Sequence, residues 1–116
     1  MISTLLTLAL AAQVAAATPV ATDEGAPLPP VDIVLYSDFQ CPFCQQFAQP
    51  VRELLSKGID GVKTIVTFKH FPLSIHPNAQ IAHQASIAAK AQGKFWEMHD
   101  LLFANQQRVQ KDDLVG

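Results

Sequence analysis

The chain has 116 residues, of which 49% are hydrophobic and 16% are charged, and its formal net charge is −2. This composition is typical of one small globular domain and excludes a disordered chain. The small negative charge provides no basic surface for nucleic acid. Because the chain has only two cysteines, a four-cysteine zinc site, a cysteine-ligated iron–sulfur cluster and a scaffold of several disulfides are also excluded.

Residues 1–17 have the pattern of a secretory signal peptide. Their apolar stretch is shorter than the roughly 20 residues that span a bilayer, and Ala15 and Ala17 are small residues suited to cleavage after residue 17. No Lys or Arg precedes the apolar stretch, so an uncleaved membrane-associated anchor is the alternative. In either case we expect a periplasmic or other extracytoplasmic protein, where disulfides persist. If the signal peptide is cleaved, we expect no stable membrane span.

Residues 18–30 contain four of the eight prolines and predict an extended linker. The folded domain is expected over residues 31–116. Its first element, residues 31–38, carries a continuous apolar run that predicts a central parallel strand buried on both faces.

A helix is predicted over residues 41–57, because apolar residues recur there at three- and four-residue intervals. Pro42 falls in the first turn, where no hydrogen bond is lost, and Gly58 is a typical helix end. The β-branched and aromatic residues 62–71 predict a second strand. Strand, helix and strand within about 40 residues form a βαβ unit.

Three further helices are predicted in the rest of the chain. Residues 78–92 are rich in alanine, residues 94–105 carry apolar residues at helical spacing, and a last helix starts at Asp112. His83 is expected to be solvated on the polar face of its helix. Phe95 and Trp96 are expected to pack in the core.

The two cysteines form a C-x-x-C motif, Cys41-Pro42-Phe43-Cys44, at the start of the first helix. The free N–H groups at a helix N-terminus stabilise a thiolate on the first cysteine. The second cysteine lies one turn further on, close enough to form a disulfide with it. After a buried strand and before a helix, this motif predicts thiol–disulfide exchange, with Cys41 as nucleophile and Cys44 as the resolving thiol.

The stretch VLYSDFQCPFCQQFAQPVREL resembles the active-site region of the DsbA-like thiol–disulfide oxidoreductases of the thioredoxin superfamily. FKHFPLSIHPNAQIAHQASIAAKAQGKFWEMHDLLFANQ resembles a strand and the inserted helical segment of the same group. The resemblance implies an α/β thioredoxin-like fold with a helical insertion. It also implies that Cys41 and Cys44 exchange disulfides with exported proteins and with a redox partner, without a metal or an organic cofactor.

The sequence departs from this family at several points. Leu35 occupies the position where many relatives carry a buried carboxylate, six residues before the first cysteine. Phe43 stands between the cysteines, where strong oxidants often have histidine, so we expect a less oxidising centre tuned by Pro42 and Phe43. The last strands, the cis-proline loop and the final helix of the family lie beyond residue 116, so the expected fold is incomplete.

Two other functions remain open at this point. One is a non-catalytic thioredoxin-like binding or chaperone module with a structural disulfide, although so short a loop stabilises little. The other is an exported copper- or zinc-binding protein that uses Cys41 and Cys44 with histidines. The four histidines, however, have no spacing typical of metal ligands, and we expect structural or surface roles for them.

Overall fold

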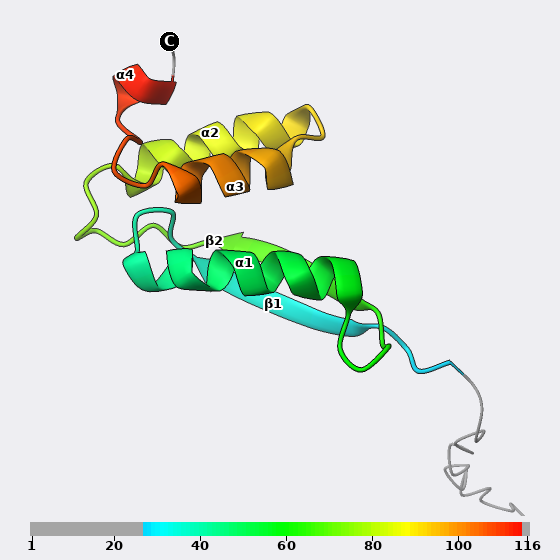
Figure 1. Ribbon diagram of the computed structural model, residues 1–116. Coiled ribbons are helices and arrows are strands. Elements are labelled where there is room, and N and C mark those ends of the chain that lie inside the picture. The colour runs from blue at the N-terminus through cyan, green and yellow to red at the C-terminus, as the bar shows by residue number, and fades with distance from the viewer. Residues whose placement is uncertain (1–26, 115–116) are drawn as a thin grey trace, which may run out of the picture.

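The computed structural model describes residues 27–114 (Figure 1). The elements are β1 (Val31–Ser37), α1 (Pro42–Lys57), β2 (Thr64–His70), α2 (Ala79–Ala91), α3 (Phe95–Ala104) and α4 (Lys111–Leu114). Every predicted helix and strand is present. The predicted signal peptide, residues 1–17, and most of the predicted linker, residues 18–30, lie outside the described residues.

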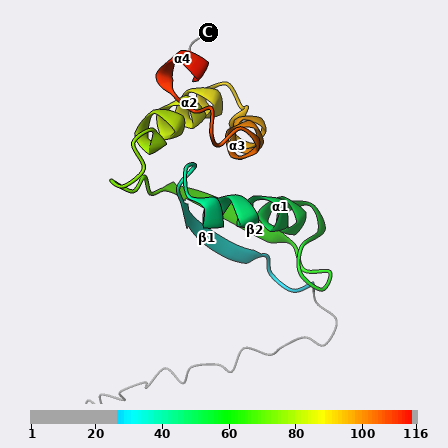
Figure 2. The same ribbon diagram turned by 60° about the vertical axis from the view of Figure 1, so that its left-hand side comes forward.

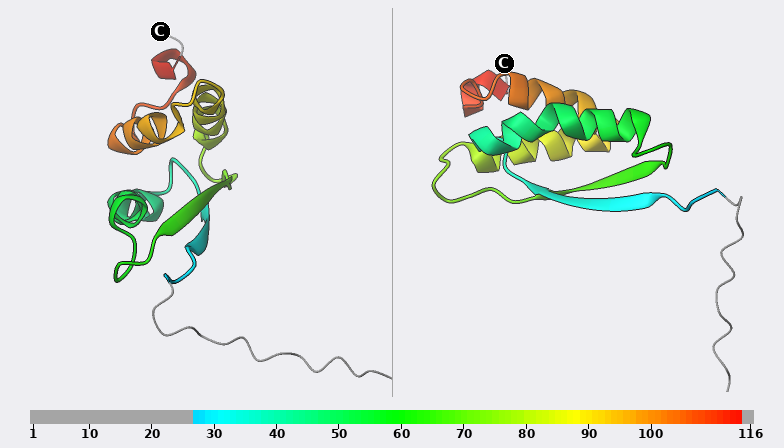
Figure 3. Two further views of the ribbon diagram at one scale, coloured as in Figure 1. Left: turned by 90° about the vertical axis from the view of Figure 1, so that its right-hand side faces the viewer. Right: turned by 60° about the horizontal axis from the view of Figure 1, so that its bottom comes forward.

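β1 and β2 form a parallel two-stranded sheet, in which Val31 pairs with Thr64 and Ser37 pairs with His70. α1 connects the two strands and lies along one face of the sheet (Figure 3). The predicted βαβ unit is therefore confirmed. Because both strands run in the same direction, their carboxyl ends meet at one edge of the unit, where the chain turns into α1 and into the loop before α2.

The prediction that β1 is buried on both faces is wrong for the part of the chain that the structure describes. Val34 and Tyr36 are 54% and 64% exposed, whereas Ile33 and Leu35 are half-buried. The alternation arises because α1 covers only one face of the sheet. Every second side chain of β1 points to the other face and remains in solvent.

α1 has well-defined ends. Pro42 occupies the first turn, as predicted, and Gly58 follows the last residue with φ 71°. The Gly58 N–H donates to the Leu54 carbonyl oxygen at 2.9 Å. A side chain at Gly58 would collide with the Val62 backbone oxygen, so glycine is required where the chain turns back toward β2.

The hydrophobic core lies between the βαβ unit and the pair of helices α2 and α3 (Figure 2). Its centre is the fully buried ring of Phe39, which stacks on the Phe68 ring of β2 with 5.3 Å between the ring centroids. The centroid of the Phe103 ring of α3 lies 5.0 Å from that of Phe39. Phe95 packs against Phe68 at 5.1 Å, which agrees with the core role predicted for it. The buried hydrophobic residues that make up this core cluster are Phe39, Ala82, Leu102, Phe103 and Val109.

The prediction that His83 is solvated is wrong. His83 is buried on the face of α2 that also buries Ala82 and Ser86, and its ring lies 4.7 Å from the Phe39 ring. Because alanines occupy almost every side of this helix, the hydrophobic pattern identified its buried face poorly. Aromatic contacts in the core determine which face is turned inward.

Candidate functional site

Cys41 and Cys44 lie where β1 turns into α1. Cys41 is the residue before the first helical turn, with extended backbone angles (φ −74°, ψ 122°), and Pro42 begins the helix. The first turn contains no acidic residue, so no neighbouring carboxylate there opposes a thiolate at the positive helix end. Both cysteines are unbridged and half-buried, and Cys44 packs against the core cluster.

The buried carboxylate of Asp38 organises the turn that precedes Cys41. One of its oxygens accepts a hydrogen bond from the Gln40 N–H at 2.7 Å. The other accepts one from the Leu73 N–H at 2.8 Å and lies 2.7 Å from Nδ1 of His76. The Cys41 N–H donates to the backbone oxygen of Asp38 at 3.1 Å. Asp38 thus holds the cysteine turn and the loop after β2 together.

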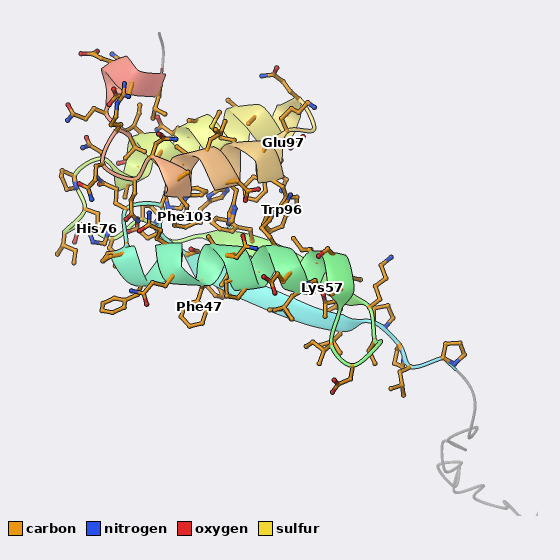
Figure 4. The ribbon with its side chains drawn as sticks, viewed as in Figure 1. Phe47, Lys57, His76, Trp96, Glu97 and Phe103 are labelled. Atoms are coloured by element: carbon orange, nitrogen blue, oxygen red, sulfur yellow. The ribbon has the colours of Figure 1, made fainter. Side chains whose placement is uncertain are left out.

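Asp38 is ionised at neutral pH. Burial alone would raise its pKa, but the hydrogen bonds from His76, Leu73 and Gln40 outweigh burial and hold the pKa below its usual value. Because an ionised carboxylate can only accept, Nδ1 of His76 is the donor in this pair. Figure 4 shows His76 in the loop between β2 and α2, beside the start of α1.

Hydrogen bonds from two glutamine side chains connect the start of α1 with α3 and with the segment that follows α3. The buried side chain of Gln106 donates from Nε2 to the backbone oxygens of Phe39 at 3.0 Å and of Cys41 at 2.8 Å. Nε2 of Gln45 donates to the Phe103 backbone oxygen at 2.6 Å. The backbone carbonyls of Phe39 and of Cys41 itself are therefore held by one side chain, Gln106, from the far end of the described chain.

A largely apolar cavity of about 210 Å³ adjoins Cys44. It lies between the end of β1, the first turns of α1, and α3. Leu35, six residues before Cys41, forms part of its wall. Its principal lining residues are Leu35, Tyr36, Cys44, Phe47, His99 and Phe103.

A pair of histidines lies on the other side of the core. Nδ1 of His70 on β2 is 2.7 Å from Nδ1 of His83 on α2, so one of these nitrogens donates to the other. Nε2 of His83 is buried without a hydrogen-bond partner. Burial, followed by the nearby His70, lowers the pKa of His83 to about 4, and burial also lowers the pKa of His70. This pair is uncharged at neutral pH.

The structure brings together all four residues of the C-x-x-C motif and adds residues that the motif did not indicate. Asp38 was detectable as an acidic residue at the end of the strand predicted over residues 31–38, three residues before Cys41. The contribution of Gln106 had no signal in the sequence, because it depends on how the segment after α3 folds back.

Within residues 27–114, no group of three or more His, Cys, Asp or Glu side chains is arranged to hold a metal ion. Over the same range, no helix combines the length and the apolar character needed to cross a bilayer.

Comparison with known proteins identifies the family and the fold. A family model described as Thioredoxin matches residues 18–115. The fold is similar to the crystal structure of alpha-DsbA1 from Wolbachia pipientis, with a TM-score of 0.58 and 23% sequence identity over 84% of this chain and 50% of that chain. The α/β thioredoxin-like fold expected from the resemblance is confirmed.

The curated relatives are long proteins that share one segment with this chain. The Na(+)/H(+) antiporter NhaA 1 of Salinispora arenicola is 48% identical over 88 residues, which are 75% of this chain and 13% of the antiporter. The Na(+)/H(+) antiporter NhaA 1 of Mycolicibacterium gilvum is 38% identical over 92 residues, or 78% of this chain and 15% of the antiporter. The chain therefore spans about one seventh of these relatives.

Replacement of Gln106 by leucine tests its hold on the cysteine turn. The variant leaves the Phe39 oxygen without this donor in a buried site, so Gln106→Leu should lower the free energy of unfolding by about 2 kcal/mol. The neighbouring Gln107 is exposed, and Gln107→Leu should change stability by less than about 0.5 kcal/mol. Urea denaturation measures both. Equal effects of the two substitutions would contradict the role assigned to Gln106.

The lowered pKa of His83 predicts acid sensitivity. Its folded-state pKa of about 4 lies below its usual value of 6.5, so below pH 6.5 the unfolded chain binds more protons and stability falls until about pH 4. Between pH 7 and pH 5 this group alone should cost about 2 kcal/mol. His83→Gln should flatten the dependence of the urea midpoint on pH over this interval. An unchanged slope would show that other groups produce the effect.

Proposed function

This chain belongs to the thioredoxin family, and we propose that it is an exported thiol–disulfide oxidoreductase whose redox centre is Cys41-Pro42-Phe43-Cys44. The family match and the DsbA-like fold support thiol–disulfide exchange in general. The observation that carries the finer proposal is the placement of Cys41 immediately before α1, with Cys44 one turn into that helix.

The chemistry follows from this placement. In the oxidised protein, a client thiolate attacks Sγ of Cys41, the Cys41–Cys44 bond breaks, and Cys44 leaves as a thiolate. A second client thiol then attacks the mixed disulfide. Two electrons pass from the client to the cysteine pair, so the client gains a disulfide and the protein becomes a dithiol. The reverse sequence reduces a client disulfide.

The surroundings of the cysteines support clients of apolar character. Phe43 and Phe47 are 70% and 64% exposed, and with Tyr36 they line the cavity beside Cys44. Figure 4 shows Phe47 projecting from α1 on the side away from α3. Exposed aromatic rings next to a reactive thiol favour peptide segments that carry apolar residues near a cysteine.

We place the protein outside the cytosol, in the periplasm or an equivalent compartment, with exported proteins as clients and a separate redox partner that resets the cysteine pair. The pattern of residues 1–17 and the persistence of disulfides outside the cytosol support this location. We assign no ion transport to this chain, because it covers only 13% of the Salinispora arenicola antiporter.

Single cysteine substitutions test the assignment. Cys41→Ser should reduce insulin-disulfide reduction to the uncatalysed rate and should form no adduct with a client, because it removes the nucleophile. Cys44→Ser should also lose turnover, but it should accumulate a mixed disulfide through Cys41, visible on a non-reducing gel. If the wild-type protein shows no turnover while its disulfide remains stable, the binding-module alternative is correct.

The residue between Pro42 and Cys44 should tune the redox potential. Phe43 brings no positive charge to the cysteine pair, so a glutathione redox titration should give a less oxidising potential in the wild type than in Phe43→His. The imidazolium of that variant should favour the thiolate and hence the reduced form by roughly tenfold in the exchange constant, or ~30 mV. Phe47→His, one turn further along α1, is the control and should change the potential less. An equal shift in both variants would contradict the tuning role of Phe43.

A further inference from the structure

If the proposed function holds, the Cys44 thiol must lose a proton whenever it resolves a mixed disulfide and regain one whenever it leaves. Leu35, which faces the same cavity, cannot take that proton. Of the side chains that line the cavity beside Cys44, only Tyr36 and His99 also titrate. Of these two kinds of side chain, histidine is the one that exchanges a proton readily near neutral pH.

His99 is held in a fixed position on α3. It is only 1% exposed, and its ring lies 5.0 Å from the Phe103 ring and 4.9 Å from the Trp96 ring. Figure 4 shows Trp96 and Phe103 directed from α3 toward α1. Because residues three and four positions apart share a helix face, His99 lies on the same side of α3, facing α1.

Asp100 sets the tautomer of His99. Nδ1 of His99 is 2.9 Å from Oδ1 of Asp100, and Oδ2 of the same carboxylate is 3.1 Å from Nε of Arg52 on α1. Since the carboxylate accepts, Nδ1 carries the proton and Nε2 is the basic nitrogen of the ring. A carboxylate that orients an imidazole in this way prepares it to accept a proton at the second nitrogen.

Burial keeps the imidazole of His99 neutral before reaction. Burial is the largest influence and lowers its pKa, Asp100 raises it, and Arg52 lowers it. Histidines also face this region from β2 and α2: His70 contacts the Phe68 ring and His83 contacts the Phe39 ring, and both of these phenylalanines also contact His99. A neutral His99 is available as a proton acceptor at physiological pH.

We propose that His99 is the acid–base partner of Cys44 and exchanges a proton with its thiol through the cavity that both residues line. With its volume of about 210 Å³, the cavity has room for a water molecule, which takes about 30 Å³ in the liquid, so the proton can pass through a water between the two side chains.

The step balances as follows when a client disulfide is reduced. In the mixed disulfide, the client sulfur is bonded to Sγ of Cys41. Cys44 gives its proton to Nε2 of His99, and the resulting thiolate attacks Sγ of Cys41. The Cys41–Cys44 bond forms as the Cys41–client bond breaks, and the departing client thiolate takes up the proton. In client oxidation, Nε2 of His99 takes up the proton that the client thiol loses as it becomes the attacking thiolate, and His99 then passes this proton to the leaving thiolate of Cys44.

The test compares two buried histidines. Pre-reduced full-length wild type, His99→Gln and His83→Gln are mixed with a model peptide disulfide, and formation and resolution of the mixed disulfide are followed by rapid quench between pH 5 and pH 8. His99→Gln should form the mixed disulfide at the wild-type rate and resolve it at least about tenfold more slowly. His83→Gln does not alter the cavity and should resolve it at the wild-type rate.

Asp100→Asn provides a second test that does not depend on the folding of His99→Gln. Asp100 is 45% exposed and its ion pair with Arg52 lies at the surface, so its replacement costs little stability. Because Asp100 raises the pKa of His99, the pH midpoint of the resolution step should move to lower pH in Asp100→Asn.

The outcomes distinguish failure of the proposed thiol exchange from failure of the role assigned to His99. If wild type forms no mixed disulfide, the proposed function itself fails, and the role of His99 with it. If wild type turns over, but His99→Gln resolves the adduct at the wild-type rate or Asp100→Asn keeps the wild-type midpoint, thiol exchange stands and the role of His99 is overturned. A slow step in His99→Gln alone, with a lowered midpoint in Asp100→Asn, supports the assignment.

Discussion

The burial of one aromatic ring determines how the rest of this structure is assembled. Phe39 lies two residues after the end of β1 and is fully buried, in contact with rings from β2, α2 and α3. Cys41 lies only two residues further along the chain. The turn that carries the first cysteine is therefore held by the same contact that joins the βαβ unit to the helical pair, and displacement of this turn would open the core.

Hydrogen bonds also stabilise the turn that the buried Phe39 ring holds in place. A turn between a strand and a helix leaves backbone groups that neither element pairs, and burial makes each unpaired group costly. Asp38 accepts from the Gln40 and Leu73 N–H groups, and Gln106 donates to the Phe39 and Cys41 oxygens. Together these two side chains pair backbone groups on either side of the turn that carries Cys41.

Much of this architecture was predictable because it depends on local spacing. The apolar run of β1, the proline at the start of α1 and the glycine at its end determine where the elements lie, and the C-x-x-C motif then falls at a helix N-terminus. The exposure of β1 was not predictable, because it depends on which faces are covered. The burial of His83 depends on the rotation of an alanine-rich helix, and the contact of Gln106 depends on chain reversal after α3.

The hydrogen bond from Gln106 to Cys41 joins residues that are 65 positions apart. Synthesis proceeds from the N-terminus at about 5–20 residues per second, so roughly 3 to 13 seconds separate the appearance of Cys41 from that of Gln106. During this interval both thiols exist without the contact that completes their turn. The nascent chain therefore carries a dithiol whose two sulfurs are not yet distinguished by the hydrogen bond from Gln106.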